Sequence, residues 1–337
     1  MKITDIKIEK YEKKFISKTK LGKNYFESRS GWYIKIYSDE IYGIGEACPL
    51  PELSSENHED AGYALEGFKI ALDGINYDVE LEELLLLSDV HGFNVPSAQF
   101  AIQAAVYNLL SQINNQSVAK HLNVNHLDVV NINSIIHPQS IIKPENTKIL
   151  KIKIDEKNIF SIKEKIENIL KVYPDGIKIR LDFNGQLDLV RSIRVCKELE
   201  DFNIDYIEQP LDKNNIKDIY ELRMTTSIPI ALDESVINYN SVVDIINLGA
   251  ADVLIIKPTL IGSFSEIRKI ASLANQEGLR VIVTSSFESS VAQHYILNLI
   301  SALEISEYCG VCNVQLFNDD IFFAISNSQY KIQDIEI

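Results

Sequence analysis

Eight short apolar runs recur through the second part of the chain, and they constrain its fold more than any other feature. The runs are VVNINSII, ILKIKI, GIKIRLDF, IDYIEQP, IPIALDE, VLIIKP, RVIVTSS and, more weakly, EYCGVCNV. Between most of them lie stretches suited to amphipathic helices, such as residues 158–173 and 186–200. Near-continuous apolar strands that alternate with helices are typical of a parallel sheet covered on both faces. Eight such strands predict a TIM-type barrel over residues 128–313.

The first part of the chain has a different pattern. Alternating apolar residues in KITDIKIEKY, GWYIKIYS and EIYGIGEACPL predict antiparallel strands. Two helical segments follow, and Pro96 suits the first turn of the second one. The tail from residue 314 predicts more strand, which returns to the N-terminal region. A doubly wound open sheet is the alternative to the barrel, but the first βα turn lacks the GxGxxG loop of that fold.

The formal net charge of −15 argues against nucleic acid or an acidic membrane as the main partner. It leaves room for an anionic substrate bound by local lysines or by a metal ion. No window of 18 residues is apolar and uncharged, and the first residues lack the apolar core of a signal peptide, so we expect a cytoplasmic protein. The CxxC pair of Cys309 and Cys312 has no second pair or matching histidines, and we interpret it as reduced core thiols.

Five of the predicted barrel strands end in an ionisable residue. These residues are Lys153, Asp182, Glu208, Asp233 and Lys257, and successive members are 24 to 29 residues apart, about one βα unit. They therefore fall at equivalent heights on successive strands. The carboxyl ends of barrel strands form the active-site face of such folds.

Three converging carboxylates repel one another unless a cation lies among them. Asp182, Glu208 and Asp233 on rigid strands therefore predict a Mg²⁺ site. Lys153 and Lys257 lie on strands four apart in an eight-stranded barrel, so a substrate on the metal would have one lysine on each face. The alternative interpretation is a set of salt bridges that closes the barrel mouth.

The run ILKIKI places Lys151 and Lys153 two residues apart, so both side chains should point to the same face of one strand. A neighbouring like charge, a metal ion and burial all lower the pKa of a lysine, and Lys153 must be neutral to act as a base. Lys151 would also attract a substrate carboxylate. The alternative is that both lysines are surface residues of an edge strand.

Together these residues resemble the motifs of the enolase superfamily. The motifs are KxK at 151–153, DxN at 182–184, EQP at 208–210, DES at 233–235 and KP at 257–258. The resemblance covers essentially the whole chain. It implies an N-terminal α+β capping domain at 1–127, a modified (β/α)7β barrel at 128–313 and a tail at 314–337 that rejoins the cap. It also implies Mg²⁺ as the cofactor, with Mn²⁺ as a substitute.

Within that superfamily the chain most resembles the o-succinylbenzoate synthase family of menaquinone biosynthesis. The supporting segments are KPTLIGS, SSFESS, SRSGWYIKI and GIGEACPLPELS. The resemblance implies dehydration of 2-succinyl-6-hydroxy-2,4-cyclohexadiene-1-carboxylate through an enediolate, with Lys153 as the base and Lys257 as the opposite, stabilising cation. N-succinylamino acid racemisation, or another racemase or epimerase reaction of the superfamily, is the nearest alternative, since N-succinylamino acid racemisation uses the same five residues. A catalytically inactive binding or scaffold relative is a remote alternative.

The same resemblance supplies candidate substrate contacts for a small carboxylate substrate. They are Lys151, Asn184, Gly262, Ser286, Glu288 and Arg29. Segments 17–26 and 49–54 are the candidate lid of the cap over the site, and Gly22 suits a mobile loop there. The sequence carries no signal for the oligomeric state.

Overall fold

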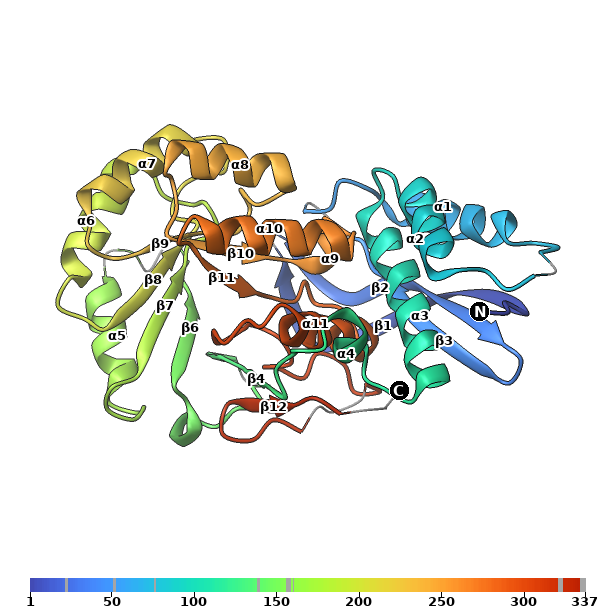
Figure 1. The fold of residues 1–337 in the computed structure, drawn as a ribbon. Helices are drawn as coiled ribbons and strands as arrows, with labels where there is room; N and C mark the ends of the chain where they lie inside the picture. Colours follow the sequence, from blue (N-terminus) through green and yellow to red (C-terminus); the bar gives the residue numbers. More distant parts are fainter. Residues whose placement is uncertain are drawn as a thin grey trace.

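The computed structural model describes residues 1–21, 24–50, 53–75, 77–137, 140–155, 159, 161–320 and 324–333. The chain forms a barrel with helices on its outside and a smaller α+β unit, the cap, beside it (Figure 1). The cap elements are β1 (Asp5–Leu21), β2 (Asn24–Ser38), β3 (Ile41–Ala47), α1 (His58–Ala71), α2 (Leu81–His91), α3 (Pro96–Asn114) and α4 (Val118–Leu122).

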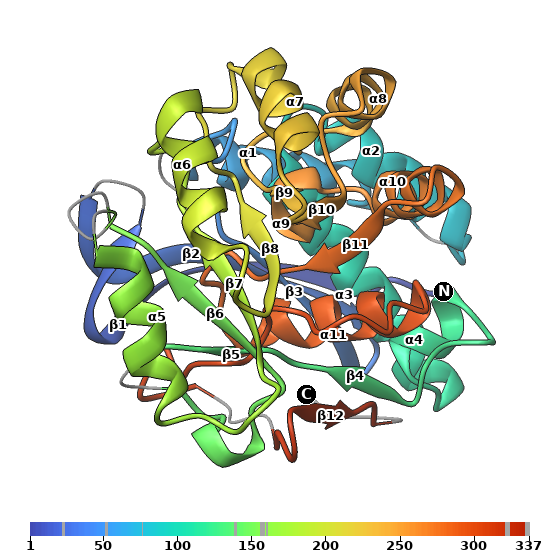
Figure 2. The same cartoon turned by 90° about the vertical axis from the view of Figure 1, so that its left-hand side faces the viewer.

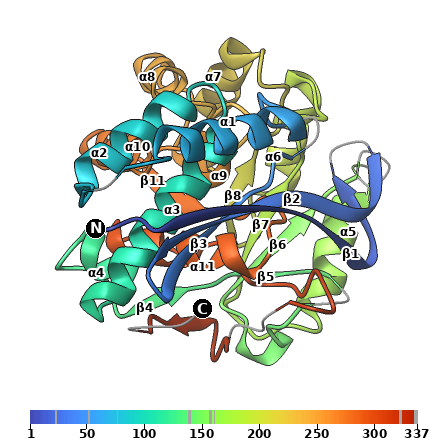
Figure 3. The ribbon, with the colours of Figure 1, turned by 90° about the vertical axis from the view of Figure 1, so that its right-hand side faces the viewer.

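The cap is built on an antiparallel sheet in the order β1-β2-β3. Figure 3 shows this sheet in front of the barrel, with α1 and α2 on one side of it. The glycines at 43 and 45 allow α3 to lie directly on β3, because a Cβ at Gly45 would stand 1.9 Å from the carbonyl oxygen of Ala101. Helix α3 begins with Pro96 in its first turn, as the sequence predicts. The cap thus has its own apolar core between sheet and helices.

The barrel strands are parallel and short. They are β4 (Val129–Asn131), β5 (Ser134–Ile135), β6 (Ile149–Lys153), β7 (Lys178–Asp182), β8 (Ile204–Glu208), β9 (Ile230–Leu232), β10 (Val253–Ile256) and β11 (Arg280–Val283). Seven of them form one sheet in the order β11-β10-β9-β8-β7-β6-β5. Cys309 and Gly310 close the barrel, since they form parallel bridges to Ile132 on one side and to Thr284 on the other. This closure excludes the open doubly wound sheet.

Helices cover the outside of the strands (Figure 2). They are α5 (Ile162–Leu170), α6 (Leu189–Leu199), α7 (Ile216–Thr225), α8 (Tyr239–Leu248), α9 (Pro258–Ile261), α10 (Phe264–Gln276) and α11 (Ser290–Ala302), with a 3-10 turn at Pro144–Asn146. Helices α5 to α8 each connect two successive strands, and α9 and α10 both lie between β10 and β11. Helix α11 leads from β11 to the bridges at Cys309 and Gly310. The fold is therefore the enolase-like barrel with an N-terminal α+β cap that the sequence predicts.

The C-terminal segment contacts both parts of the molecule. Strand β12 (Gln329–Lys331) pairs antiparallel with β4. Earlier in the segment, Phe317 forms an antiparallel bridge with Phe15 of β1, where the pairing of β1 with β2 shifts register between Lys14 and Thr19. Phe15, Leu316 and Phe317 form a separate small apolar cluster.

Several sequence expectations change in detail. The first predicted barrel strand divides into β4 and β5, and the last is reduced to the bridges at Cys309 and Gly310. In the candidate lid, residues 17–21 and 24–26 belong to β1 and β2 instead of a loop, while residues 22–23 and 51–52 lie outside the described residues. All four cysteines are buried and free, which agrees with the prediction made for Cys309 and Cys312. No helix of the described chain has the length and apolar character to cross a bilayer.

Candidate active site

The charged strand ends meet at one end of the barrel. Lys153, Asp182 and Glu208 are the last residues of β6, β7 and β8, and they pair in register as neighbours. Asp233 directly follows β9, and Lys257 directly follows β10. Because β7, β8 and β9 lie between β6 and β10 in the sheet, the two lysines flank the three carboxylates.

These residues surround a pocket of about 930 Å³. Lys151 and Lys153 both line it, so the strand directs both lysines to one face, as the i, i+2 spacing predicts. Strand β6 lies between β5 and β7, which excludes the edge-strand alternative for this pair. The cap contributes Asn24, Leu50 and Leu53 to the wall of the pocket.

Lys151 occupies the space between two of the carboxylates. Its Nζ lies 2.6 Å from Oε1 of Glu208 and 3.1 Å from Oδ2 of Asp182. Burial lowers the pKa of Lys151, but the two carboxylates outweigh burial and raise the pKa well above its ordinary value. Two negative charges therefore offset the positive charge of Lys151. The sequence suggested that Lys151 repels a proton on Lys153 as an uncompensated charge, and the structure shows that it is compensated.

A similar ion pair joins the other side of the row. Nζ of Lys257 lies 2.5 Å from Oδ2 of Asp233, and this carboxylate raises the pKa of Lys257 against the opposing effect of burial. Glu208 is completely buried, and burial with the nearby charge of Asp182 raises its pKa to about 8. The site thus pairs buried carboxylates with buried lysines at short range.

The three carboxylates have the chemistry of a hard-cation site. Oε2 of Glu208 and Oδ1 of Asp233 are buried and accept no hydrogen bond from any described residue. Oxygen atoms without donors suit Mg²⁺, which prefers carboxylate ligands. Within the described chain no three Asp, Glu, His or Cys side chains are already arranged around a common metal position. Lys151 and Lys257 form ion pairs with these carboxylates.

Two residues beside the row escaped the sequence analysis. Gln209 is buried, and its Oε1 accepts from the backbone N–H of Asp233 at 3.0 Å and of Ser235 at 3.2 Å. It therefore fixes the end of β9 from the end of β8. Glu234 lines the pocket, and its Oε1 accepts from Nδ2 of Asn184 at 3.0 Å. Gln209 lies in the EQP motif and Glu234 in the DES motif. These motifs are the sequence signal that could have identified the two residues.

The predicted substrate contacts divide into two groups. Lys151, Asn184 and Ser286 line the pocket, and the Ser286 hydroxyl is buried without a partner among the described residues. Glu288 lies behind the wall, where it accepts from the Thr259 hydroxyl and from the backbone N–H of Ser286, each at 2.5 Å. Burial raises the pKa of Glu288. Phe287, which the sequence analysis did not select, lines the pocket with its ring centroid 5.9 Å from Nζ of Lys153.

The structure does not bring Arg29 and Gly262 to the pocket wall. The Arg29 guanidinium is buried in the cap, where it donates to the carbonyl oxygens of Cys48 and Pro49. Its substrate-binding role stays a prediction, and in this structure its contacts are to the backbone of the cap. Gly262 has φ of +90° and faces the start of α3, where an added Cβ would lie 2.8 Å from Cα of Pro96. The absence of a side chain at Gly262 therefore lets this part of the barrel pack closely against helix α3 of the cap.

The fold and the charged strand ends define an enzyme barrel of the enolase type. Comparison with known families agrees: a family described as enolase C-terminal domain-like matches residues 140–327, and a family described as MenC, N-terminal domain, matches residues 3–109. The chain belongs to the enolase superfamily.

Its relatives have more than one activity. N-succinyl-L-Arg/Lys racemase of Bacillus cereus is 28% identical over 277 residues, covering 77% of this chain and 73% of that protein. o-Succinylbenzoate synthase of Desulfotalea psychrophila is 24% identical over 328 residues, covering 87% and 89%. The crystal structure of a dipeptide epimerase from Enterococcus faecalis, complexed with Mg and L-Leu-L-Tyr, gives a TM-score of 0.85 at 19% identity over 99% of this chain and 98% of that one. These similarities agree with the superfamily that the family model shows, and the solved structure shows the fold. The proteins that this chain resembles include a racemase, a synthase and an epimerase.

Proposed function

We propose that the protein is a cytoplasmic o-succinylbenzoate synthase, a carbon–oxygen lyase. It would dehydrate 2-succinyl-6-hydroxy-2,4-cyclohexadiene-1-carboxylate in a Mg²⁺-dependent reaction. The observation that carries the proposal is the combination of a cap that matches the MenC N-terminal family with three carboxylates between two lysines. A synthase relative that spans most of both chains supports it.

Asp182, Glu208 and Asp233 would hold Mg²⁺, and their donor-free oxygens support this assignment. When bound, Mg²⁺ supplies a Lewis acid that stabilises negative charge on the substrate carboxylate. Mn²⁺ is expected to substitute, because it accepts the same oxygen ligands. Lys151 would stay beside the row and attract the carboxylate of the substrate.

Lys153 is exposed at the pocket, where it can reach a substrate. It would take the proton from the ring carbon next to the carboxylate, and the electron pair of that C–H bond would move towards the carboxylate as an enediolate. The pair then returns to the ring as the C–O bond to the hydroxyl breaks. Lys153 gives its proton to the departing hydroxide, so water leaves and the ring becomes aromatic. Lys257, on the opposite side, would remain charged and stabilise the intermediate.

N-succinylamino acid racemisation is the second candidate. The specific observation in its favour is that Lys153 and Lys257 flank the carboxylates, as a reaction that adds and removes a proton on opposite faces requires. The Bacillus cereus racemase relative supports the same reading.

A paired assay with Mg²⁺ separates the two candidates. Loss of the cyclohexadiene chromophore reports dehydration, and α-proton exchange of N-succinyl amino acids in D₂O reports racemisation. Fast dehydration that falls by about 10³-fold or more in Lys153→Ala would establish the synthase and its base, since a positioned general base contributes roughly 10²- to 10⁴-fold. Slow dehydration with fast exchange would assign the racemase. Absence of both activities from a Mg²⁺-binding protein would refute both proposed substrates.

A further inference from the structure

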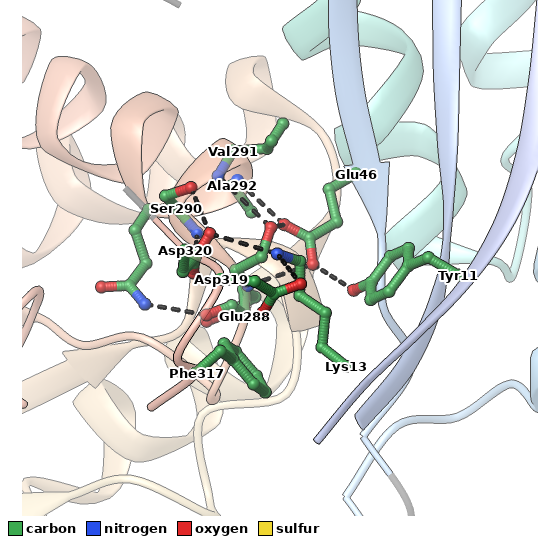
Figure 4. Close-up of polar contacts among 12 residues, drawn as sticks. Tyr11, Lys13, Glu46, Glu288, Ser290, Val291, Ala292, Phe317, Asp319 and Asp320 are labelled. Carbon is green, nitrogen blue, oxygen red and sulfur yellow. Dashed lines mark hydrogen bonds and ion pairs between the residues drawn. The ribbon is translucent and has the colours of Figure 1, made fainter. Parts of the chain in front are cut away.

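Helix α11 begins with a buried carboxylate of the cap bound to its first turn (Figure 4). Glu46, near the end of β3, is fully buried. Its Oε1 accepts from the backbone N–H of Ser289 at 3.1 Å and from the Tyr11 hydroxyl. Its Oε2 accepts from the Ser289 hydroxyl at 2.6 Å and from the backbone N–H of Ala292 at 3.0 Å. Four donors and the positive end of the helix dipole thus stabilise this charge.

A second carboxylate reaches the same turn from the C-terminal segment. Oδ2 of Asp320 accepts from the backbone N–H of Ser290 at 2.8 Å, and Oδ1 accepts from the Ser290 hydroxyl at 2.6 Å. Nζ of Lys13, on β1, lies 3.5 Å from Asp320. The α11 first turn (residues 289–292) is therefore the point where cap, barrel and C-terminal segment are joined by hydrogen bonds.

The pocket loop (residues 285–288) directly precedes this turn. It carries Ser286 and Phe287 into the pocket wall. Phe287 has φ of +63°, a left-handed conformation that is costly for a residue with a bulky side chain. Such a conformation persists only where the surroundings hold it, and the anchors are Glu288 on one side and the α11 first turn on the other.

The Phe287 ring also packs on the cap and the C-terminal segment. It lies against the apolar cluster of Phe15, Leu316 and Phe317. Its centroid is 5.9 Å from Nζ of Lys153. The cap therefore contacts the pocket loop in two ways: through Glu46 at the α11 first turn, and through the packing of Phe287 on Phe15.

We propose that Glu46 is a positioning residue for the active site. By binding the α11 first turn to β3, it holds the pocket loop in the conformation that places Ser286 and Phe287 against the substrate. Glu46 itself does not touch the pocket. The inference rests on the proposed function in one respect: it assumes that the reaction takes place at Lys153, beside the pocket loop.

The test compares Glu46→Gln with Tyr295→Phe. Glutamine keeps the size of the side chain, but one of the two acceptor oxygens becomes an NH2 group, which cannot accept. A backbone N–H of Ser289 or Ala292 therefore loses its partner. Tyr295→Phe is the matched control, because the Tyr295 hydroxyl joins the same helix to the same strand by donating to the carbonyl oxygen of Ile44 at 2.6 Å, away from the pocket loop. Both variants weaken the docking of α11 on β3.

We expect Glu46→Gln to lower kcat/KM for the wild-type reaction by about 10- to 100-fold, since small displacements of positioning groups cost up to about 10²-fold. Hydrogen–deuterium exchange of residues 286–292 should rise in the same variant. Tyr295→Phe should lower the melting temperature comparably and leave kcat/KM within about twofold of wild type. Equal loss of activity in both variants, or unchanged activity in folded Glu46→Gln, would overturn the proposal.

Two provisions keep the test decisive. If Glu46→Gln does not fold, Ser289→Ala removes one of the four donors to Glu46, together with the contacts of the hydroxyl to the Val291 N–H and to Tyr33. It should change activity and exchange in the same direction by less. If the wild-type protein has neither proposed activity, the proposed function fails, and exchange alone decides on Glu46. Faster exchange of residues 286–288 in Glu46→Gln but not in Tyr295→Phe would then support the positioning role, and identical exchange would refute it.

Discussion

The ammonium group of Lys151 lies 2.6 Å from Oε1 of Glu208, deep in the row of carboxylates at the barrel mouth. The same ammonium lies 3.1 Å from Asp182. Lys151 thus binds two of the three carboxylates that are proposed to hold Mg²⁺. In the proposed site the lysine and the metal compete for these carboxylates.

Replacing Lys151 by methionine should tighten Mg²⁺ binding by about tenfold, which corresponds to about 1.4 kcal/mol. The metal-free variant should lose about 3 kcal/mol of stability, because removing one partner of a buried ion pair leaves charge uncompensated. Isothermal titration calorimetry and urea unfolding, with and without Mg²⁺, measure both effects.

Lys213→Met provides the control, because Lys213 lines the same pocket but is exposed. This variant makes the same change in charge and should keep its Mg²⁺ affinity within about threefold of wild type. If Lys151→Met bound Mg²⁺ no more tightly than Lys213→Met, competition between Lys151 and the metal would be ruled out.

The barrel and its charged strand ends could be predicted because both follow from local repetition. Each apolar run is the strand of one βα unit, and the units are similar in length. The residues that end these strands, Asp182, Glu208 and Asp233, therefore lie at one height in the barrel. The shared face of Lys151 and Lys153 follows from strand geometry alone. The partners of Lys151 could not be predicted, because they lie on two other strands, β7 and β8, and no local pattern gives their distance from it.

The cap contacts could not be predicted because they join distant parts of the chain. Arg29 binds the carbonyl oxygens of Cys48 and Pro49, and nothing in the local sequence distinguishes this from a substrate contact. Gly262 approaches Pro96 across the cap–barrel boundary. Glu46 is an ordinary strand residue by pattern, and only the folded chain places it at the start of α11.

Gly262→Ala should destabilise the docking of the cap on the barrel. The position has φ of +90°, and its new Cβ would also lie 2.7 Å from Oε1 of Gln99 and 2.8 Å from Cα of Pro96. Gly278→Ala is the control, because Gly278 has φ of +74° and no heavy atom within 4 Å of the added Cβ. We expect a loss of about 1 kcal/mol for Gly278→Ala from backbone strain, and a further loss of about 1–3 kcal/mol for Gly262→Ala from crowding. Equal losses in urea unfolding would show that Pro96 and Gln99 move aside freely.

Arg180→Met should be among the most destabilising substitutions in the barrel. Arg180 is fully buried, its Nε lies 2.7 Å from Oδ2 of Asp205, and its guanidinium stacks 4.7 Å from the Tyr206 ring. Arg280 compensates Asp205 in part, with Nη2 at 3.0 Å. Unfolding experiments should show a loss of about 3 kcal/mol, since Asp205 stays buried with one partner fewer.

The exposed pair of Arg194 and Glu198 on α6 provides the comparison, with Nε and Oε1 2.9 Å apart. Arg194→Met should cost less than about 0.5 kcal/mol, because solvent screens an exposed helical ion pair. A small loss for Arg180→Met as well would mean that Arg280 and Lys178 together compensate the charge of Asp205.

Acid should destabilise the protein partly through His294. This residue is buried within α11, where Nδ2 of Asn298 lies 3.2 Å from its Nε2, and burial lowers the pKa of His294 to about 4. The unfolded chain binds a proton at this histidine below about pH 6.5, whereas the folded chain stays neutral there until about pH 4. The stability that the neutral imidazole contributes is therefore fully present above pH 6.5 and is lost as pH falls towards 4, by about 3 kcal/mol in total.

His294→Gln should show a correspondingly smaller loss between pH 7 and 4 in urea unfolding. Tyr295→Phe, the neighbouring buried substitution, should keep the wild-type slope because it removes no group that titrates in this range. Parallel pH profiles for His294→Gln and wild type would mean that His294 is protonated in the folded state.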